Sequence, residues 1–261
     1  MTSLVKKIVL ITGASSGIGL ACARAFAQQG ARLILTARRK ERLDALAREL
    51  KQERGTESRV LELDVRNQAA VQTILQNLPA EWQEVEVLVN NAGLSRGLNK
   101  LHEGKIQDWE EMIDTNIKGL LYVTRLILPG MVARGRGTII NIGSIAGHEV
   151  YVGGNVYCAT KHAVDAITRG LRWDLVDTPI RVCTVDPGLV ETEFSMVRFR
   201  GDEQRAKAVY QNVTPLRPED IAETVVFCAT RPAHVQVAEL IVLPTNQASA
   251  SLVHRVPTAT E

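Results

Sequence analysis

The sequence predicts an α/β protein built on a doubly wound parallel sheet of about seven strands, with helices on both faces. Short apolar stretches of strand length alternate along the chain with longer segments of helical periodicity. The strand-like stretches are mostly apolar throughout, which indicates burial on both faces and hence a parallel sheet covered by helices. There is no internal repeat and no Pro/Gly-rich linker, so we expect one domain over residues 1–261.

The strands can be assigned in order from these apolar stretches, beginning with I-V-L-I directly after the N-terminal lysines. The expected strands are residues 8–11, 32–36, 60–63, 85–89, 138–142, 180–185 and 240–243. The segment after about residue 245, beyond Pro244, is polar, and we expect it to be loosely ordered or to lie at a subunit contact.

Helical periodicity fills the intervals between these strands. The expected helices are residues 18–29, 40–53, 68–78, 109–133, 156–176, 203–211 and 219–229. The fourth has an apolar stripe wider than one core-facing side needs, which indicates a helix-on-helix subunit interface and an oligomer. Its members are Ile113, Ile117, Leu120, Leu121, Val123, Leu126 and Ile127.

Composition excludes several classes of function. The net charge of +2 argues against a dedicated nucleic-acid surface, and no apolar run reaches membrane length. The four cysteines include no C-x-x-C pair, and the five histidines show no ligand spacing. We therefore expect no metal site and no disulfide framework, in a soluble cytoplasmic protein that acts on a small molecule.

The first motif, T-G-A-S-S-G-I-G, spans residues 12–19 between the first strand and the first helix. Glycine permits positive φ and lets a phosphate approach backbone N–H groups, where the helix dipole favours an anion. Gly13, Gly17 and Gly19 have the required spacing. Ser15 and Ser16 could cap the helix, donate to a phosphate, or do both.

The end of the second strand indicates the dinucleotide. An NAD site usually has a carboxylate there for the ribose 2′-hydroxyl, whereas a 2′-phosphate requires arginine. The sequence has Ala37, Arg38 and Arg39 at this point. Basic residues at the start of a helix often only face solvent. Cations in the first turn oppose the helix dipole, however, so they bring little structural benefit here, and this favours a role in binding. We predict NADP(H).

Further motifs follow in order, and all but one lie at carboxyl ends of expected strands or on helices facing that edge, where such sheets bind ligands. They are L-D-V (63–65), N-N-A-G (90–93), D-T-N-I (114–117), I-N-I-G-S (140–144), Y-C-A-T-K (157–161) and D-P-G-L-V-E-T (186–192). With these motifs in this order, the chain resembles the short-chain dehydrogenase/reductase family over essentially its whole length.

The resemblance implies a Rossmann-type fold, a tetramer or dimer, and roles for individual residues. It implies the catalytic tetrad Asn116, Ser144, Tyr157 and Lys161. It implies cofactor contacts from Gly13, Ser15, Ser16, Gly17, Ile18, Gly19, Arg38, Arg39, Asp64, Val65, Asn91, Gly93, Tyr157, Lys161, Pro187, Gly188, Val190 and Thr192.

The spacing of Tyr157 and Lys161 has a chemical reading. Residues four apart on a helix share a face, and an ammonium beside a phenol favours the phenolate and should lower a pKa that is otherwise about 10. Tyr157 would then be the general acid in reduction and the base in oxidation, while Ser144 donates to the substrate oxygen. By the resemblance, Lys161 also holds the cofactor ribose, and Asn116 anchors a water that relays protons.

The segments 193–202, 215–223 and 232–235 resemble the NADP-dependent serine and 3-hydroxy acid dehydrogenases of the family, which implies a small hydroxy acid or the matching carbonyl compound as substrate. Ser144, Tyr157 and Arg198 are the expected substrate contacts. Arg198 or Arg200 could pair with a substrate carboxylate, or either could be an exposed side chain on a mobile segment. The alternatives are a carbonyl reductase with no carboxylate preference and a non-catalytic nucleotide-binding module, which the intact tetrad argues against.

Overall fold

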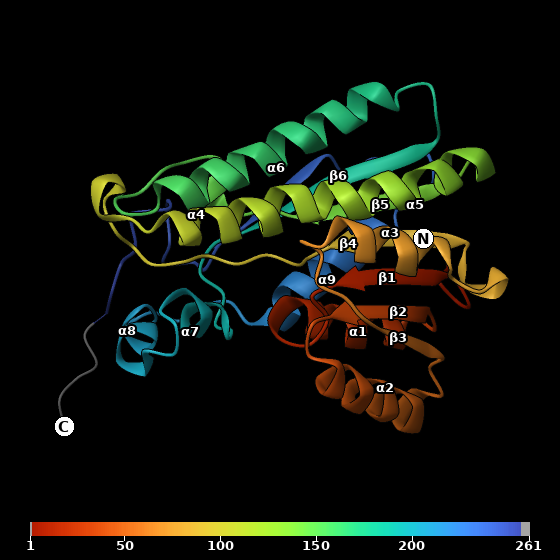
Figure 1. Cartoon of the computed structure of the whole chain (residues 1–261), viewed down its shortest axis with the longest axis horizontal. Coiled ribbons are helices and arrows are strands. Elements are labelled where there is room, and N and C mark those ends of the chain that lie inside the picture. The colour runs from red at the N-terminus through yellow and green to blue at the C-terminus, as the bar shows by residue number, and fades with distance from the viewer. Residues whose placement is uncertain (1, 257–261) are drawn as a thin grey trace.

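The computed structural model describes residues 2–256, and its centre is one parallel sheet of seven strands (Figure 1). The strand order is β3-β2-β1-β4-β5-β6-β7. The strands are β1 (Ile8–Thr12), β2 (Arg32–Ala37), β3 (Ser58–Glu62), β4 (Val85–Asn90), β5 (Gly137–Ile142), β6 (Ile180–Pro187) and β7 (Glu239–Val242). Each pairs in parallel with its neighbour, so the predicted fold class is confirmed.

The strand order creates a switch point beside β1. The chain builds outward from β1 through β2 to β3, then crosses back to start β4 on the other side of β1. Leu10 therefore pairs with Ile34 of β2 and with Leu88 of β4. Crevices outside the carboxyl ends of strands at such a point are where doubly wound sheets bind ligands.

Helices cover both faces of the sheet, as Figure 1 shows. The helices of one face are α1 (Gly17–Gln28), α2 (Lys40–Arg54) and α9 (Pro218–Ala229). Those of the other are α3 (Gln68–Gln76), α5 (Leu120–Arg134) and α6 (Asn155–Asp174). Successive strand residues serve the two cores alternately: Val9 and Ile11 belong to the first, Ile8 and Leu10 to the second.

Burial on both faces holds for the central strands but not for the edges. β1 is buried at every residue, whereas β3 is only partly buried and β7 is partly exposed. The prediction of complete burial is therefore wrong for the two edge strands, because each has a neighbour on one side only. β3 also begins at Ser58, two residues before the predicted start.

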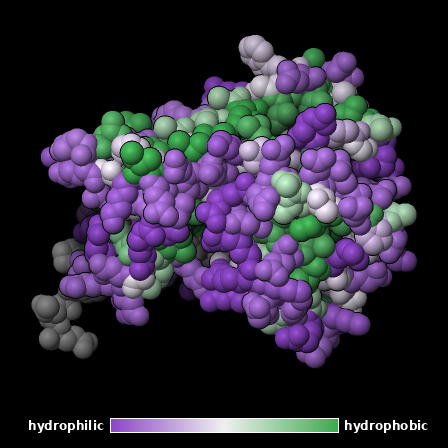
Figure 2. All heavy atoms as spheres, in the orientation of Figure 1, coloured by the Kyte–Doolittle hydropathy of each residue, from purple (hydrophilic) through white to green (hydrophobic). Residues whose placement is uncertain are grey.

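The predicted helix 109–133 is interrupted. α4 (Ile106–Ile113) runs into a π-helix, η3 (Asp114–Gly119), which leads into α5. Three members of the apolar stripe, Leu120, Val123 and Ile127, are buried in the core. Ile113 and Leu121 are 38% and 42% exposed. Figure 2 shows apolar side chains gathered in a band over α5 and α6.

Two short helices, α7 (Phe194–Arg198) and α8 (Glu203–Ala208), lie together beyond one end of the sheet (Figure 1). The sequence indicated no helix at α7, whose five residues are too few to show periodicity, and the predicted helix 203–211 ends early, at Ala208. The remaining short elements are the 3₁₀ turns η1 (Ala80–Trp82), η2 (Leu101–Glu103) and η4 (Ile145–Gly147). None of the described helices combines the length and apolar character needed to cross a bilayer.

The segment after residue 245 is described as far as residue 256 and contacts the body of the protein there. The Ala250 N–H donates to the Glu149 carboxylate at 2.8 Å, and the Val256 N–H donates to the Asn212 carbonyl at 3.0 Å. Residues 257–261, which belong to the same predicted segment, lie outside the described residues.

Candidate active site

One cavity of about 780 Å³ opens at the carboxyl ends of the strands. The loops after β1, β2, β4, β5 and β6 line it, together with the start of α6 and with α7. It brings together every predicted site residue except Gly19 and Asn116. Arg200, the alternative to Arg198, does not line it.

The turn between β1 and α1 is shaped for an anion. Gly13 has φ +67°, which favours glycine, and α1 begins at Gly17. A Cβ on Gly19 would lie 2.5 Å from the Gly13 carbonyl oxygen. Glycine at this position therefore lets α1 approach the turn closely, although Gly19 itself does not line the cavity. Ser16, the N-cap residue, makes no side-chain capping hydrogen bond. The first N–H groups of α1 therefore remain available to a phosphate.

The serine side chains of this turn are instead held by Arg39. Its Nη2 donates to Ser16 Oγ at 2.7 Å and to Ser15 Oγ at 3.2 Å. Its Nη1 donates to Glu193, 2.8 Å away, and Arg42 donates to the other oxygen of the same carboxylate. The capping role considered for Ser16 is therefore wrong for this structure.

Arg38 lines the same end of the cavity with its side chain exposed, and Ala37 before it is buried. Asp64 and Val65 follow β3 nearby, and the Asp64 carboxylate accepts from Arg66 Nη2 at 2.6 Å. Two guanidiniums and no carboxylate at the end of β2 suit a 2′-phosphate.

Asn91 ties the loop after β4 to the glycine-rich turn. Its Nδ2 donates to the carbonyls of Thr12 and Gly13, at 2.8 and 3.2 Å. Thr12 Oγ1 accepts in return from the Asn91 N–H at 3.0 Å. These bonds fix the two loops that flank the switch point relative to each other.

Tyr157 and Lys161 lie one turn apart on α6 and are 8% and 7% exposed. Lys161 Nζ is 6.0 Å from the centroid of the Tyr157 ring and donates to the Ile142 carbonyl at 2.8 Å. Ser144 follows β5, and its Oγ accepts from the Ala146 N–H at 3.1 Å. Three predicted catalytic side chains thus share one wall of the cavity.

Burial dominates the protonation of this pair. It raises the pKa of Tyr157, an effect that Tyr151 reinforces and that Arg198 and Ser144 oppose. It lowers the pKa of Lys161 to about 8, against the opposing effect of Asp186. The pKa of Tyr157 is therefore raised overall, and not lowered as expected, because desolvation of the phenolate is the largest effect.

Asn116 lies in the π-helix η3 and is buried beside the cavity. Its Nδ2 donates to the Leu94 carbonyl at 2.9 Å and to Thr160 Oγ1 at 3.0 Å, and its Oδ1 accepts from the Leu94 N–H. π-Helical turns are frequent at functional sites. The contacts hold the loop after β4, and the water relay stays a prediction.

The two candidate arginines differ clearly. Arg198 Nη2 donates to the Tyr151 hydroxyl at 3.1 Å, and Arg198 Cζ lies 5.4 Å from the centroid of the Tyr157 ring. Its Nε is buried without a hydrogen-bond partner among the described residues. Arg200 instead pairs with Asp108 outside the cavity. Arg198 therefore lines the cavity and Arg200 does not.

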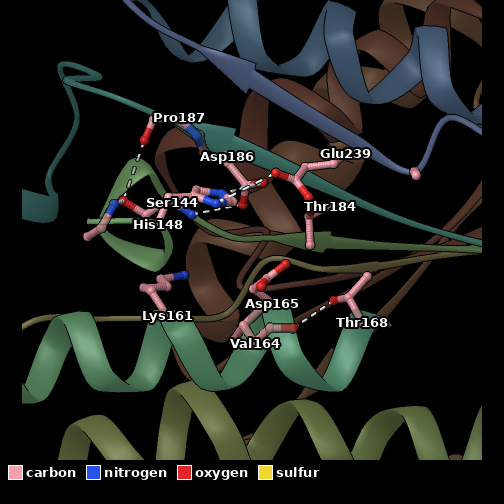
Figure 3. Close-up of polar contacts among 12 residues, drawn as sticks. Ser144, His148, Lys161, Val164, Asp165, Thr168, Thr184, Asp186, Pro187 and Glu239 are labelled. Carbon is pink, nitrogen blue, oxygen red and sulfur yellow. Dashed lines mark hydrogen bonds and ion pairs between the residues drawn. The ribbon is translucent and has the colours of Figure 1, made fainter. Parts of the chain in front are cut away.

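Two features were missed from the sequence. Tyr151, which lines the cavity and holds Arg198, stands in no motif; its only signal is that it is one of four tyrosines in a chain poor in aromatics. Behind Ser144, the buried Asp186 accepts from the Ser144 N–H at 3.1 Å and faces His148 (Figure 3). Burial raises the pKa of Asp186, and the nearby Thr184 and His148 oppose this effect.

Several known proteins are similar to this chain over most of its length. The short chain dehydrogenase family profile matches residues 7–203. The NADP-dependent 3-hydroxy acid dehydrogenase YdfG of Salmonella typhi is 52% identical over 250 residues, 95% of this chain and 99% of that protein. Sulfoacetaldehyde reductase 2 of Chromohalobacter salexigens is 49% identical over 242 residues, 92% of this chain and 95% of that protein. The closed form of serine dehydrogenase complexed with NADP+ superposes with a TM-score of 0.89 at 51% identity, covering 95% of this chain and all of that one. The chain therefore belongs to the short-chain dehydrogenase family.

Proposed function

We propose that this protein is an NADP(H)-dependent oxidoreductase that interconverts a small hydroxy acid and the matching carbonyl compound. The single observation that carries the proposal is the position of Arg198, which lies over the ring of Tyr157 in the cavity that the glycine-rich turn also lines. The relatives named as 3-hydroxy acid dehydrogenase and sulfoacetaldehyde reductase support it, because both names describe a substrate with an acidic group.

The residues present fit the cofactor. Bound NADP(H) would supply or accept the hydride. The turn of Gly13, Ser15, Gly17 and Ile18 offers the N-terminus of α1 to the pyrophosphate, and Arg38 and Arg39 offer guanidiniums to the 2′-phosphate. Further contacts to the cofactor would come from Asp64, Val65, Asn91, Gly93, Lys161, Pro187, Gly188, Val190 and Thr192.

Tyr157 is the proposed proton donor. A phenol is protonated at neutral pH, and burial raises the pKa of Tyr157 further, so its hydroxyl carries the proton that the substrate oxygen would take up in reduction. Ser144 would donate a second hydrogen bond to that oxygen as negative charge develops. Lys161, as a cation beside the phenol, would stabilise the phenolate left after transfer.

Arg198 is the proposed contact for the acidic group of the substrate. Tyr151 accepts from one of its donors, while Nε is buried without a hydrogen-bond partner among the described residues. A carboxylate or sulfonate would satisfy that donor by a charge-assisted bond. The second candidate, a carbonyl reductase indifferent to charge, would leave the Arg198 Nε without a hydrogen-bond partner.

We further propose a homotetramer, or a homodimer, located in the cytoplasm. The exposed Ile113 and Leu121 support an oligomer, because the core leaves this side of the helix pair uncovered. Sedimentation at micromolar concentration should give a dimer or tetramer, and Leu121→Glu should dissociate it. A monomeric unmodified protein would contradict the proposal.

The decisive experiment follows NADPH oxidation with a panel of small semialdehydes, keto acids and neutral ketones of equal size. We expect the anionic substrates to have the higher kcat/KM, and NADPH to exceed NADH with each of them. Equal efficiency for neutral and anionic substrates would favour the second candidate. The absence of turnover with every class would favour a binding module.

A further inference from the structure

Behind the wall of the cavity, three side chains with metal-binding groups meet although they are far apart in the sequence. His148 follows η4, Asp186 lies near the end of β6, and Glu239 begins β7. One ligand atom from each lies within 4.8 Å of the other two. None of the three lines the cavity described above. Figure 3 shows their side chains pointing toward one another beside Ser144.

The closest pair in this cluster is near but not hydrogen bonded. His148 Nε2 lies 3.2 Å from Asp186 Oδ2. Both atoms are buried, and neither has a hydrogen-bond partner among the described residues. The N–H direction of the ring therefore misses the oxygen, and a misaligned contact of this kind is weak. Asp186 is 2% exposed, so its Oδ2 is a buried carboxylate oxygen directed into the cluster with nothing to satisfy it.

We propose that His148, Asp186 and Glu239 bind one divalent cation of the zinc class. Zinc prefers imidazole nitrogen and carboxylate oxygen at about 2.0–2.2 Å, which places neighbouring ligand atoms of a tetrahedron roughly 3.4 Å apart. The separation of 3.2 Å between His148 Nε2 and Asp186 Oδ2 already suits such a pair. Three protein ligands leave the fourth position to water.

Glu239 is the third ligand, and its side chain must turn to complete the site. Its Oε1 lies 3.6 Å from His148 Nδ1, whereas Asp186 faces the other ring nitrogen, Nε2. Because one cation binds only one nitrogen of an imidazole, the carboxylate of Glu239, whose side chain is 27% exposed, would move toward Nε2. Arg169 competes for the glutamate, but it is 3.6 Å from the other oxygen, Oε2, and is itself 55% exposed.

A cation here would act on the position of Ser144. Asp186 binds the proposed cation through Oδ2 and accepts from the Ser144 N–H through Oδ1, at 3.1 Å. The site would also join the loop after β5 to β6 and to the edge strand β7. Its role is therefore to stabilise and position these elements, because it lies outside the cavity where the reaction would occur.

The test is binding of zinc to the cofactor-free protein after removal of metals with a chelator. Calorimetric titration with ZnCl₂ should give one saturable site per chain. His148→Asn and Glu239→Gln should each weaken binding at least about tenfold, because each removes one of three ligands. His102→Asn is the matched control: His102 also lies beside a glutamate, at 3.5 Å from Glu103, but on the surface and outside the cluster. It should leave the affinity unchanged.

Circular dichroism of each metal-free variant establishes that it is folded, and Co²⁺ in place of Zn²⁺ gives a visible spectrum that reports the ligand set directly. The proposal is overturned if the unmodified protein shows no saturable site, or if zinc binding survives both cluster substitutions. It is equally overturned if His102→Asn weakens binding as much as they do. None of these results depends on turnover, so they stand apart from the test of the proposed function.

Discussion

The two ends of the cavity are built differently. At the cofactor end, the walls are loops that directly follow β1, β2 and β4, and backbone groups and the Asn91 amide do most of the positioning. At the substrate end, the walls are side chains from distant segments, above all Tyr151 and Arg198, joined by one hydrogen bond. The first end can be deduced from contiguous motifs, whereas the second exists only after folding. The following changes test this contrast, from the largest expected effect to the smallest.

Tyr157→Phe removes the proposed proton donor, which lines the cavity between its two ends. We expect kcat to fall by about 10²–10⁴-fold, the range typical of a positioned general acid, while NADPH affinity stays nearly unchanged. Stopped-flow rates and fluorescence titration with NADPH check the two parts. Tyr122→Phe, a change at a partly buried tyrosine of the core, is the control and should retain turnover. Substantial turnover in the Tyr157→Phe variant would remove Tyr157 from the mechanism.

Lys161 should make stability depend on pH. Its pKa is 10.5 in the unfolded chain and about 8 in the folded one. Between these two pKa values the unfolded state binds more protons than the folded state, so the free energy of unfolding rises with pH from about 8 to 10.5. This gain in stability is lost as the pH falls back through about 8. Relative to Lys161→Met, which cannot titrate, the cofactor-free protein should gain about 3 kcal/mol over that window. Urea denaturation at several pH values measures it; parallel curves for the two proteins would mean that Lys161 is not buried as described.

The double change Ala37→Asp with Arg38→Leu should alter only the cofactor end. It removes a partner of the 2′-phosphate and adds an acceptor for a 2′-hydroxyl. We expect the affinity for NADPH to fall by about one to two decades, from a lost charge-assisted contact of roughly 1.5–3 kcal/mol, and NADH to improve. kcat/KM for both cofactors at fixed substrate is the measurement. If the KM of the substrate changed as much as that of the cofactor, the two ends would not be separable.

Arg198→Ala should alter only the substrate end. KM for an anionic substrate should rise roughly tenfold, the low end for a hydrogen bond to a charged group, and KM for a neutral ketone should change little. Arg200→Ala removes a guanidinium two residues away that pairs with Asp108 outside the cavity, so it is the matched control and should leave both KM values as they are. Equal losses with both substrates would indicate that Arg198 only holds α7 in place.

Sequence patterns predicted the sheet well because a buried parallel strand must be apolar and must be followed by a turn. They failed where neighbours decide the outcome. β3 and β7 lie at edges, and η3 contains Asn116, whose side chain bonds to Leu94 and Thr160 from other segments. α7 is too short to have a period.

The site residues likewise divide into those fixed by local structure and those that depend on distant segments. Motifs located the glycine-rich turn and the side chains of Ser144, Tyr157 and Lys161, since each is fixed by local structure. The pKa of Tyr157 depends on what buries it, and the Ser16 side chain is held by Arg39 from another loop. His148, Asp186 and Glu239 come from three separate segments. A search for local ligand spacing could not find them, and the expectation of no metal site depended on that search.

One carboxylate connects the two ends of the cavity. Glu193 directly precedes α7, the helix that carries Arg198, and it accepts from both Arg39 and Arg42. Nη1 of Arg39 carries two N–H donors, so a phosphate can bind there while the Glu193 carboxylate keeps its own bond. A 2′-phosphate at Arg39 would place a second negative group beside Glu193, which Arg42 would still hold. We therefore expect cofactor binding and the position of α7, with Arg198 on it, to be electrostatically coupled.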